Sequence, residues 1–141
     1  MLMESLWPKL NQISQDVPVL ILKEQATIFN QEMNGVLRCE VTSSDIPPKN
    51  VHIPGIDKDF TSKLIVTSPQ LMGYSLVLVQ VNNFISKAYP CEVINCLKDS
   101  PVLGSSMAHN ADEFKQKLGK ILKSEEVITA LQNLIAQTKD I

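Results

Sequence analysis

The segment from Phe60 to Val81 constrains the fold most, because it holds two β-patterned runs on either side of a short turn. In the first run apolar and polar residues alternate, which predicts a strand with one buried face. The second run, which starts at Leu76, is apolar on both faces, as is typical of an interior strand. Pro69 and Gly73 lie between the runs, and their fixed and permissive φ angles suit a hairpin loop. We therefore expect a β-hairpin at the centre of a sheet.

Two helical patterns precede the hairpin. Leu6, Leu10 and Ile13 are spaced i, i+4, i+7, which predicts a short amphipathic helix in which Pro8 is tolerated only in the first turn. A second helix is expected over about residues 17–34, with Asp16 as its N-cap and with Asn34 and Gly35 at its end. Its apolar stripe is formed by Leu22, Ala26, Phe29 and Met33.

The remaining strands and loops surround the hairpin. Residues 36–42 alternate as a strand with one solvated face, and Cys39 lies on the apolar face. Residues 85–97 predict a fourth strand, in which Pro90 removes one ladder hydrogen bond and so places the strand at an edge or the proline at a bulge. Residues 43–59 and 98–110 are expected to be loops.

Two further helices are predicted at the end of the chain. The first begins at Asn110, which is followed three residues later by Glu113, a pair typical of a capping box. The second begins at Ser124 and carries Ile128 among its buried residues. The order of elements predicts an α+β fold, a four-stranded antiparallel meander with an N-terminal helix or helices and two C-terminal helices packed on it. We expect one domain over residues 1–141, with residues 1–15 as a loosely docked arm.

Composition limits the classes of function. The chain has 141 residues, the size of a single domain, and a formal net charge of −2 with a pI near 5.6, which disfavours nucleic acid as a partner. No run approaches the roughly 18 apolar residues of a membrane-spanning helix, and the N-terminus lacks the features of a signal peptide. Three cysteines, an odd number, suit free thiols in a reducing compartment. We expect a cytoplasmic protein that does not contact a membrane.

The residues that could perform chemistry form no catalytic pattern. Cys91 and Cys96 are five residues apart and lack the spacing of a redox or zinc pair, so no metal and no cofactor are predicted. A thiol nucleophile at Cys91 with His52 or His109 as base remains an alternative. The lysines of residues 115–123 would suit nucleic acid, but the solvated face of an amphipathic helix explains them better. Those lysines are Lys115, Lys117, Lys120 and Lys123.

These observations favour a small binding module without catalysis, which holds a protein partner or a second copy of itself. The uncovered sheet face, the strand edge with Pro90 and the N-terminal arm are the expected surfaces. Trp7 and Tyr74 are the candidate aromatic anchors. The alternative is a small-molecule binder or thiol enzyme, with a pocket between the sheet and the loops 43–59 and 98–110 that contains Cys91, His52 and His109.

Overall fold

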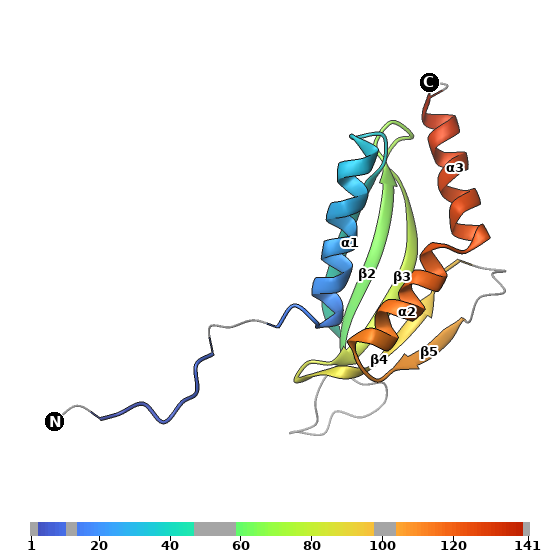
Figure 1. Ribbon diagram of the computed structural model, residues 1–141. Helices are drawn as coiled ribbons and strands as arrows, with labels where there is room; N and C mark the ends of the chain where they lie inside the picture. Colours follow the sequence, from blue (N-terminus) through green and yellow to red (C-terminus); the bar gives the residue numbers. More distant parts are fainter. Residues whose placement is uncertain (1–2, 11–13, 47–58, 98–103, 140–141) are drawn as a thin grey trace.

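In the described part of the computed structural model, three helices lie on one side of a five-stranded antiparallel sheet (Figure 1). The structure describes residues 3–10, 14–46, 59–97 and 104–139. The helices are α1 (Pro18–Met33), α2 (Ala111–Leu122) and α3 (Glu125–Lys139). The strands are β1 (Arg38–Ile46), β2 (Asp59–Ser68), β3 (Tyr74–Phe84), β4 (Lys87–Asn95) and β5 (Ser105–Ala108). The strand order is β1-β2-β3-β4-β5, so the predicted α+β meander is confirmed with five strands in place of four.

The hairpin of β2 and β3 lies at the centre of the sheet, as predicted. Its turn places Gly73 at φ +70°, a left-handed conformation that glycine adopts without steric cost. A register shift opposite Leu64 inserts an extra residue into β3. Leu78 and Val79 are therefore both buried, although they are neighbours in sequence. This irregularity explains why the run is apolar at consecutive positions.

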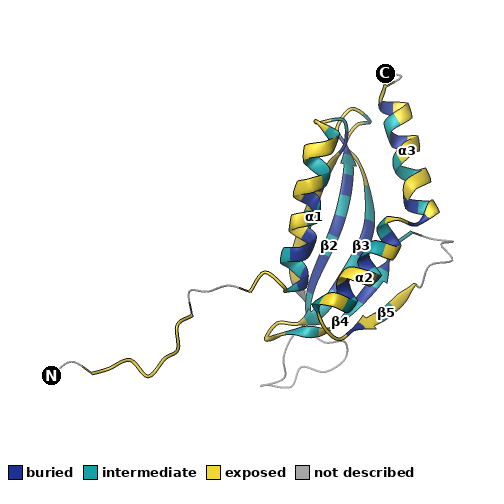
Figure 2. Cartoon of the chain, viewed as in Figure 1, coloured by how far each residue is buried: buried dark blue, intermediate teal, exposed yellow. Residues whose placement is uncertain are grey.

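The hydrophobic core lies between the sheet and the helices. Figure 2 shows buried positions on the sides of α1, α2 and α3 that face the strands. Phe114 of α2 and Leu22 of α1 are 0% exposed, and Val127 of α3 is 1% exposed. Buried aliphatic residues of the strands that face the helices include Leu64, Val66, Val79, Val81 and Val93. Because successive side chains of a strand point to opposite faces, the residues that alternate with these five lie on the face of the sheet that points away from the helices.

The opposite face of the sheet carries a row of polar side chains. Thr61 Oγ1 of β2 donates to Asn82 Oδ1 of β3 at 2.9 Å, and Asn82 Nδ2 donates to Glu92 Oε1 of β4 at 3.0 Å. Ser105 Oγ of β5 completes the row by donating to Glu92 Oε2 at 2.9 Å. No helix of the described part of the chain covers this face. A hydrogen-bonded row of this kind satisfies polar groups across four strands without a helix above them.

The helix boundaries agree with the sequence except at one cap. Helix α1 begins after Val17, and Pro18 occupies its first turn, so the prediction that Asp16 is the N-cap is wrong. Pro18 lacks an N–H, which removes one of the donors that a cap would otherwise satisfy. At α2, Asn110 Oδ1 accepts the backbone N–H of Glu113 at 2.9 Å, as predicted. At α3, Ser124 Oγ accepts the N–H of Val127 at 3.4 Å.

The predicted N-terminal helix is wrong over the described residues, because residues 3–10 contain no helix. Residues 3–10, which we call the arm, run away from the body of the protein (Figure 1). Pro8 lies in the middle of the arm, where its ring and missing N–H oppose helix formation, and it biases Trp7 toward an extended conformation. Leu6 and Leu10 thus have the spacing of an amphipathic helix, although residues 3–10 form no helix.

Three strand predictions also need correction. Residues 43–59 were expected to be a loop, but β1 extends to Ile46 and β2 begins at Asp59. Residues 98–110 were expected to be a loop, but Ser105–Ala108 form β5, which pairs with β4. Strand β4 therefore has neighbours on both sides, so the edge placement of Pro90 is wrong and the bulge placement is right. Pro90 follows a cis peptide bond, and it lies in the irregular stretch between the pairs Asn82–Glu92 and Phe84–Lys87.

The edges of the sheet are β1 and β5, and a side chain caps each of them. Asn30 of α1 donates through Nδ2 to the Cys39 carbonyl at 2.8 Å and accepts the Cys39 N–H through Oδ1 at 2.7 Å. Its carboxamide thus satisfies the two backbone groups that a neighbouring strand would bind. On β5, Lys117 Nζ donates to the Met107 carbonyl.

Candidate functional site: an apolar groove between α1 and α3

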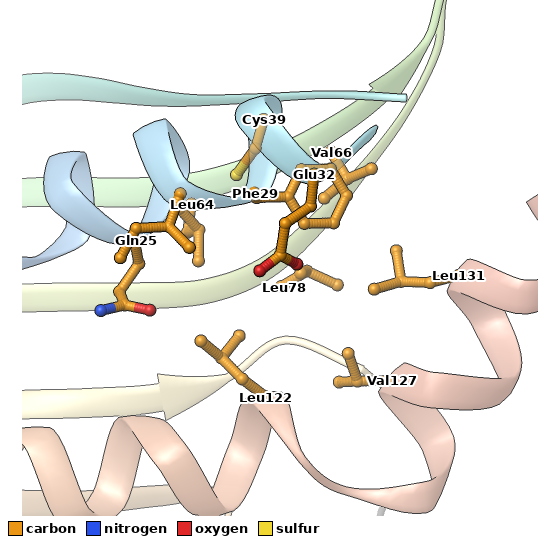
Figure 3. Close-up of a pocket in the computed structure, with 11 residues that line it drawn as sticks. Gln25, Phe29, Glu32, Cys39, Leu64, Val66, Leu78, Leu122, Val127 and Leu131 are labelled. Carbon is orange, nitrogen blue, oxygen red and sulfur yellow. The ribbon is translucent and has the colours of Figure 1, made fainter. Parts of the chain in front are cut away.

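A pocket of about 260 Å³ lies between α1 and α3 on the helical side of the sheet, and we call it the α1–α3 groove (Figure 3). Its floor is formed by β1, β2 and β3. One wall is α1, and the other is formed by the end of α2 and the start of α3. The lining residues are Gln25, Ile28, Phe29, Glu32, Cys39, Leu64, Val66, Leu78, Leu122, Val127 and Leu131.

The α1 wall follows from the helical period. The residues of α1 that line the groove, Gln25, Ile28, Phe29 and Glu32, are spaced i, i+3, i+4, i+7 and therefore lie on one side of the helix. Ile28 lies off the predicted stripe and is 41% exposed. A large apolar residue beside the core stripe widens the apolar surface of α1 beyond what the sheet covers.

The α3 wall depends on the turn after α2. Ser124 Oγ donates to the Ile121 carbonyl at 2.7 Å, and its side chain is buried at the junction of the two helices. Helix α3 then runs in a different direction from α2 (Figure 1). Val127 faces the core, and Leu131, one turn further along α3, lines the groove.

A buried hydrogen bond holds the far end of α3. Ser68 Oγ at the end of β2 and Thr138 Oγ1 in the last turn of α3 are 3.0 Å apart, and both side chains are buried. Seventy residues separate them in the sequence. This contact joins the end of α3 to the hairpin end of the sheet.

The groove is apolar inside and acidic at its rim. Burial and, to a smaller extent, the negative charge of Glu40 raise the pKa of the Cys39 thiol to about 11, so the thiol is neutral at physiological pH and behaves as an apolar group. Glu32 is exposed at the rim and, among the residues that the structure describes, is the one charged residue that lines the groove. The arrangement suits an apolar group with a cation close to it.

The three predicted partner-binding residues lie on separate elements. Trp7 is 79% exposed in the arm. Tyr74 is 52% exposed at the start of β3, where it lines a shallow depression with Leu134 on the other side of α3. Pro90 is exposed on β4. The structure therefore does not combine them into one surface.

The predicted alternative pocket is only partly within the described residues. His52 lies outside them. Cys91 is 0% exposed, and burial raises the pKa of its thiol to about 11. His109 is exposed at the start of α2, and its Nδ1 lies 3.2 Å from Glu113 Oε1, a contact that lowers the pKa of the Glu113 carboxyl. A fully buried thiol with a raised pKa is a poor nucleophile.

The described residues give little support for a metal site, a membrane-spanning helix or a nucleic-acid surface. Within the described residues, no group of three or more His, Cys, Asp or Glu side chains is arranged to hold a metal ion. None of the described helices has both the length and the apolar character needed to span a membrane. Of the α2 lysines, Lys115, Lys120 and Lys123 are exposed, whereas Lys117 caps β5.

No family model matches the chain, and no curated protein or solved structure matches it significantly. The groove and the arm are therefore the features of the molecule from which we infer its function. Sequence reasoning missed the groove. The available signal was Ile28, a large apolar residue off the core stripe of its helix.

Proposed function

We propose that the protein is a non-catalytic protein-binding module that holds an apolar segment of its partner in the α1–α3 groove. The observation that carries the proposal is the groove itself, an apolar pocket open at its rim and bounded by α1 and α3. Its volume lies below the roughly 300–1,000 Å³ of typical small-molecule sites. A pocket of this size suits one or two large side chains of a peptide, as at the centre of a protein interface.

The chemistry of the rim defines the partner further. Glu32 favours a basic residue near the apolar anchor, because a charge of opposite sign at the rim speeds encounter and fixes orientation. The buried state of Cys91 supports a role without thiol catalysis. The three cysteines are free, which fits the reducing environment of the cytosol that we expect.

Site-specific photocrosslinking tests this proposal. Ile28 is replaced by benzoylphenylalanine, and Lys23, which is exposed on another side of α1, receives the same replacement as the matched control. The proteins are irradiated in lysate of the host, and the crosslinked peptide is mapped by mass spectrometry. We expect position 28, and not position 23, to crosslink to one peptide segment that contains a large apolar residue.

A second substitution makes the result specific to the groove. Leu131→Asp places a charge on the opposite wall and should abolish the crosslink from position 28, whereas Gln132→Asp, on the exposed side of α3, should preserve it. Equal crosslinking from positions 28 and 23, or a crosslink that survives Leu131→Asp, would contradict the proposal. An adduct with the mass of a small molecule would support the small-molecule alternative instead.

A further inference from the structure

The arm exposes four large apolar side chains within eight residues. Met3, Leu6, Trp7 and Leu10 are between 72% and 93% exposed. The hydrogen bond that the arm makes within itself, from the Trp7 N–H to Ser5 Oγ at 3.2 Å, is local and exposed. A contiguous apolar segment in this state marks an interaction site. The same chain thus presents an apolar ligand and an apolar groove.

We propose that the arm of one copy docks in the α1–α3 groove of a second copy, with Trp7 as the anchor, and that reciprocal exchange produces a twofold dimer. This inference rests on the proposed function, because it names the segment that the groove accepts. An exchange of this kind is an isologous interaction in which each copy contributes an arm and a groove.

The chemistry of the arm matches that of the groove. Trp7 is the type of residue most often found as an anchor in a desolvated pocket. Lys9 follows it by two residues, a position that brings a cation to the acidic rim at Glu32. Since Pro8 keeps the arm extended, docking requires no helix to form, and less conformational entropy is lost.

The root of the arm favours a second copy over the arm's own groove. The Tyr89 hydroxyl donates to the Asp16 carbonyl, which fixes the chain beside β4 at the amino end of α2. The groove lies at the other end of α2, near Leu122. From the root the arm points away from the body (Figure 1).

The surface between the root and the groove mixes charged and apolar side chains. The shallow valley between α1 and α2 is lined by Glu24, Lys115 and Lys123 together with Ile21, Leu118 and Leu122. The seven-residue step from Leu10 to Val17 would span at most about 25 Å, so length alone permits a return to the arm's own groove. The direction in which the arm leaves the root, away from the body (Figure 1), therefore favours exchange.

The single tryptophan of the chain makes the test direct, because its fluorescence reports the arm alone. Emission and acrylamide quenching of Trp7 are measured against the concentration of the full chain, with the mass read by light scattering. We expect a shift of the emission to shorter wavelength, reduced quenching and a dimer mass, all with one midpoint. Ile28→Asp should weaken the dimer roughly tenfold or more. Gln31→Asp, on the exposed side of α1, is the matched control and should leave the midpoint unchanged.

Three outcomes would overturn the inference. The first is a monomer with solvent-exposed Trp7 at every concentration. The second is a shielded Trp7 whose emission does not depend on concentration, which would show docking in the arm's own groove. The third is a dimer that Ile28→Asp and Leu131→Asp leave intact although circular dichroism shows both variants folded. The crosslink from position 28 to a different protein would survive the first outcome, so failure of the exchange is distinguishable from failure of the proposed function.

Discussion

The hydrogen bond between Ser68 and Thr138 should stabilise the protein through a contact that no local interaction replaces. The proposed change is Thr138→Val, which replaces the hydroxyl by a methyl group of similar size. It leaves Ser68 Oγ without its partner at a position that is 0% exposed, so water cannot replace the lost bond. A buried hydroxyl without a partner costs about 1–3 kcal/mol of stability.

The double variant separates the hydrogen bond from packing. Ser68→Ala combined with Thr138→Val removes both hydroxyl groups, so no buried polar group is left unsatisfied. We expect each single variant to lose about 1–2 kcal/mol and the double variant to lose less than the sum, with a coupling energy of about 1 kcal/mol or more. For a chain of this length a loss of 1 kcal/mol lowers Tm by roughly 3–5 °C.

Urea denaturation measures the free energies, and hydrogen exchange of the α3 amides shows where the loss occurs. An unchanged m-value would show that the variants unfold from the same compact state. If the last turns of α3 open locally, their amides should lose protection while the midpoint of global unfolding moves little. Single variants as stable as the wild type, with unchanged protection in α3, would refute the role assigned to this bond.

Three further predictions concern other buried polar groups. Asn30→Ala should destabilise the protein by about 1–3 kcal/mol in urea denaturation, because it removes both hydrogen bonds that cap β1 at Cys39; a loss below about 0.5 kcal/mol, the size expected of a surface substitution, would contradict this. Ser62→Ala should raise the midpoint or leave it unchanged, since Ser62 Oγ is buried with no hydrogen-bond partner among the described residues; a clear loss of stability would reveal an unrecognised partner. The pKa of Cys39 and of Cys91 is raised from 9.0 to about 11, so folding favours their neutral form, and their contribution to stability should be complete below pH 9 and lost as the pH rises from 9 toward 11. A stability that rises across that window would oppose the assigned burial.

The parts of the fold that the sequence predicted are those with a strong local pattern. Helix α1 has both an apolar stripe and a glycine after its last turn, so the sequence predicts both the helix and the position of its end. The β2–β3 hairpin combines two β-patterned runs with the turn residues that join them. In each case local propensity and tertiary burial favour the same structure.

The parts that were missed depend on pairing between distant residues. Strand β5 contains Ser105 and Ser106 and shows no apolar alternation, and it exists because β4 offers it a backbone partner. For Pro90 the sequence left two placements open, and the register of β4 against β3 decides between them. The groove was not predictable, because its width depends on the angle of α3, which the turn at Ser124 and the contact at Thr138 set together.

The strength expected of the arm exchange connects it to the proposed function. Full burial of a large apolar side chain contributes about 1.5–3 kcal/mol. If each groove takes Trp7 and one neighbour from the arm, a dimer with two grooves gains roughly 6–12 kcal/mol before the loss of freedom on association, which opposes it by an estimated 4–15 kcal/mol. The exchange is therefore weak, and the dimer dissociates readily on dilution. A partner segment that fills the groove better, with its own cation at Glu32, would displace the arm. The arm then acts as a competitor that sets the affinity threshold for partners, and removing residues 1–10 should tighten partner binding at protein concentrations where the dimer forms.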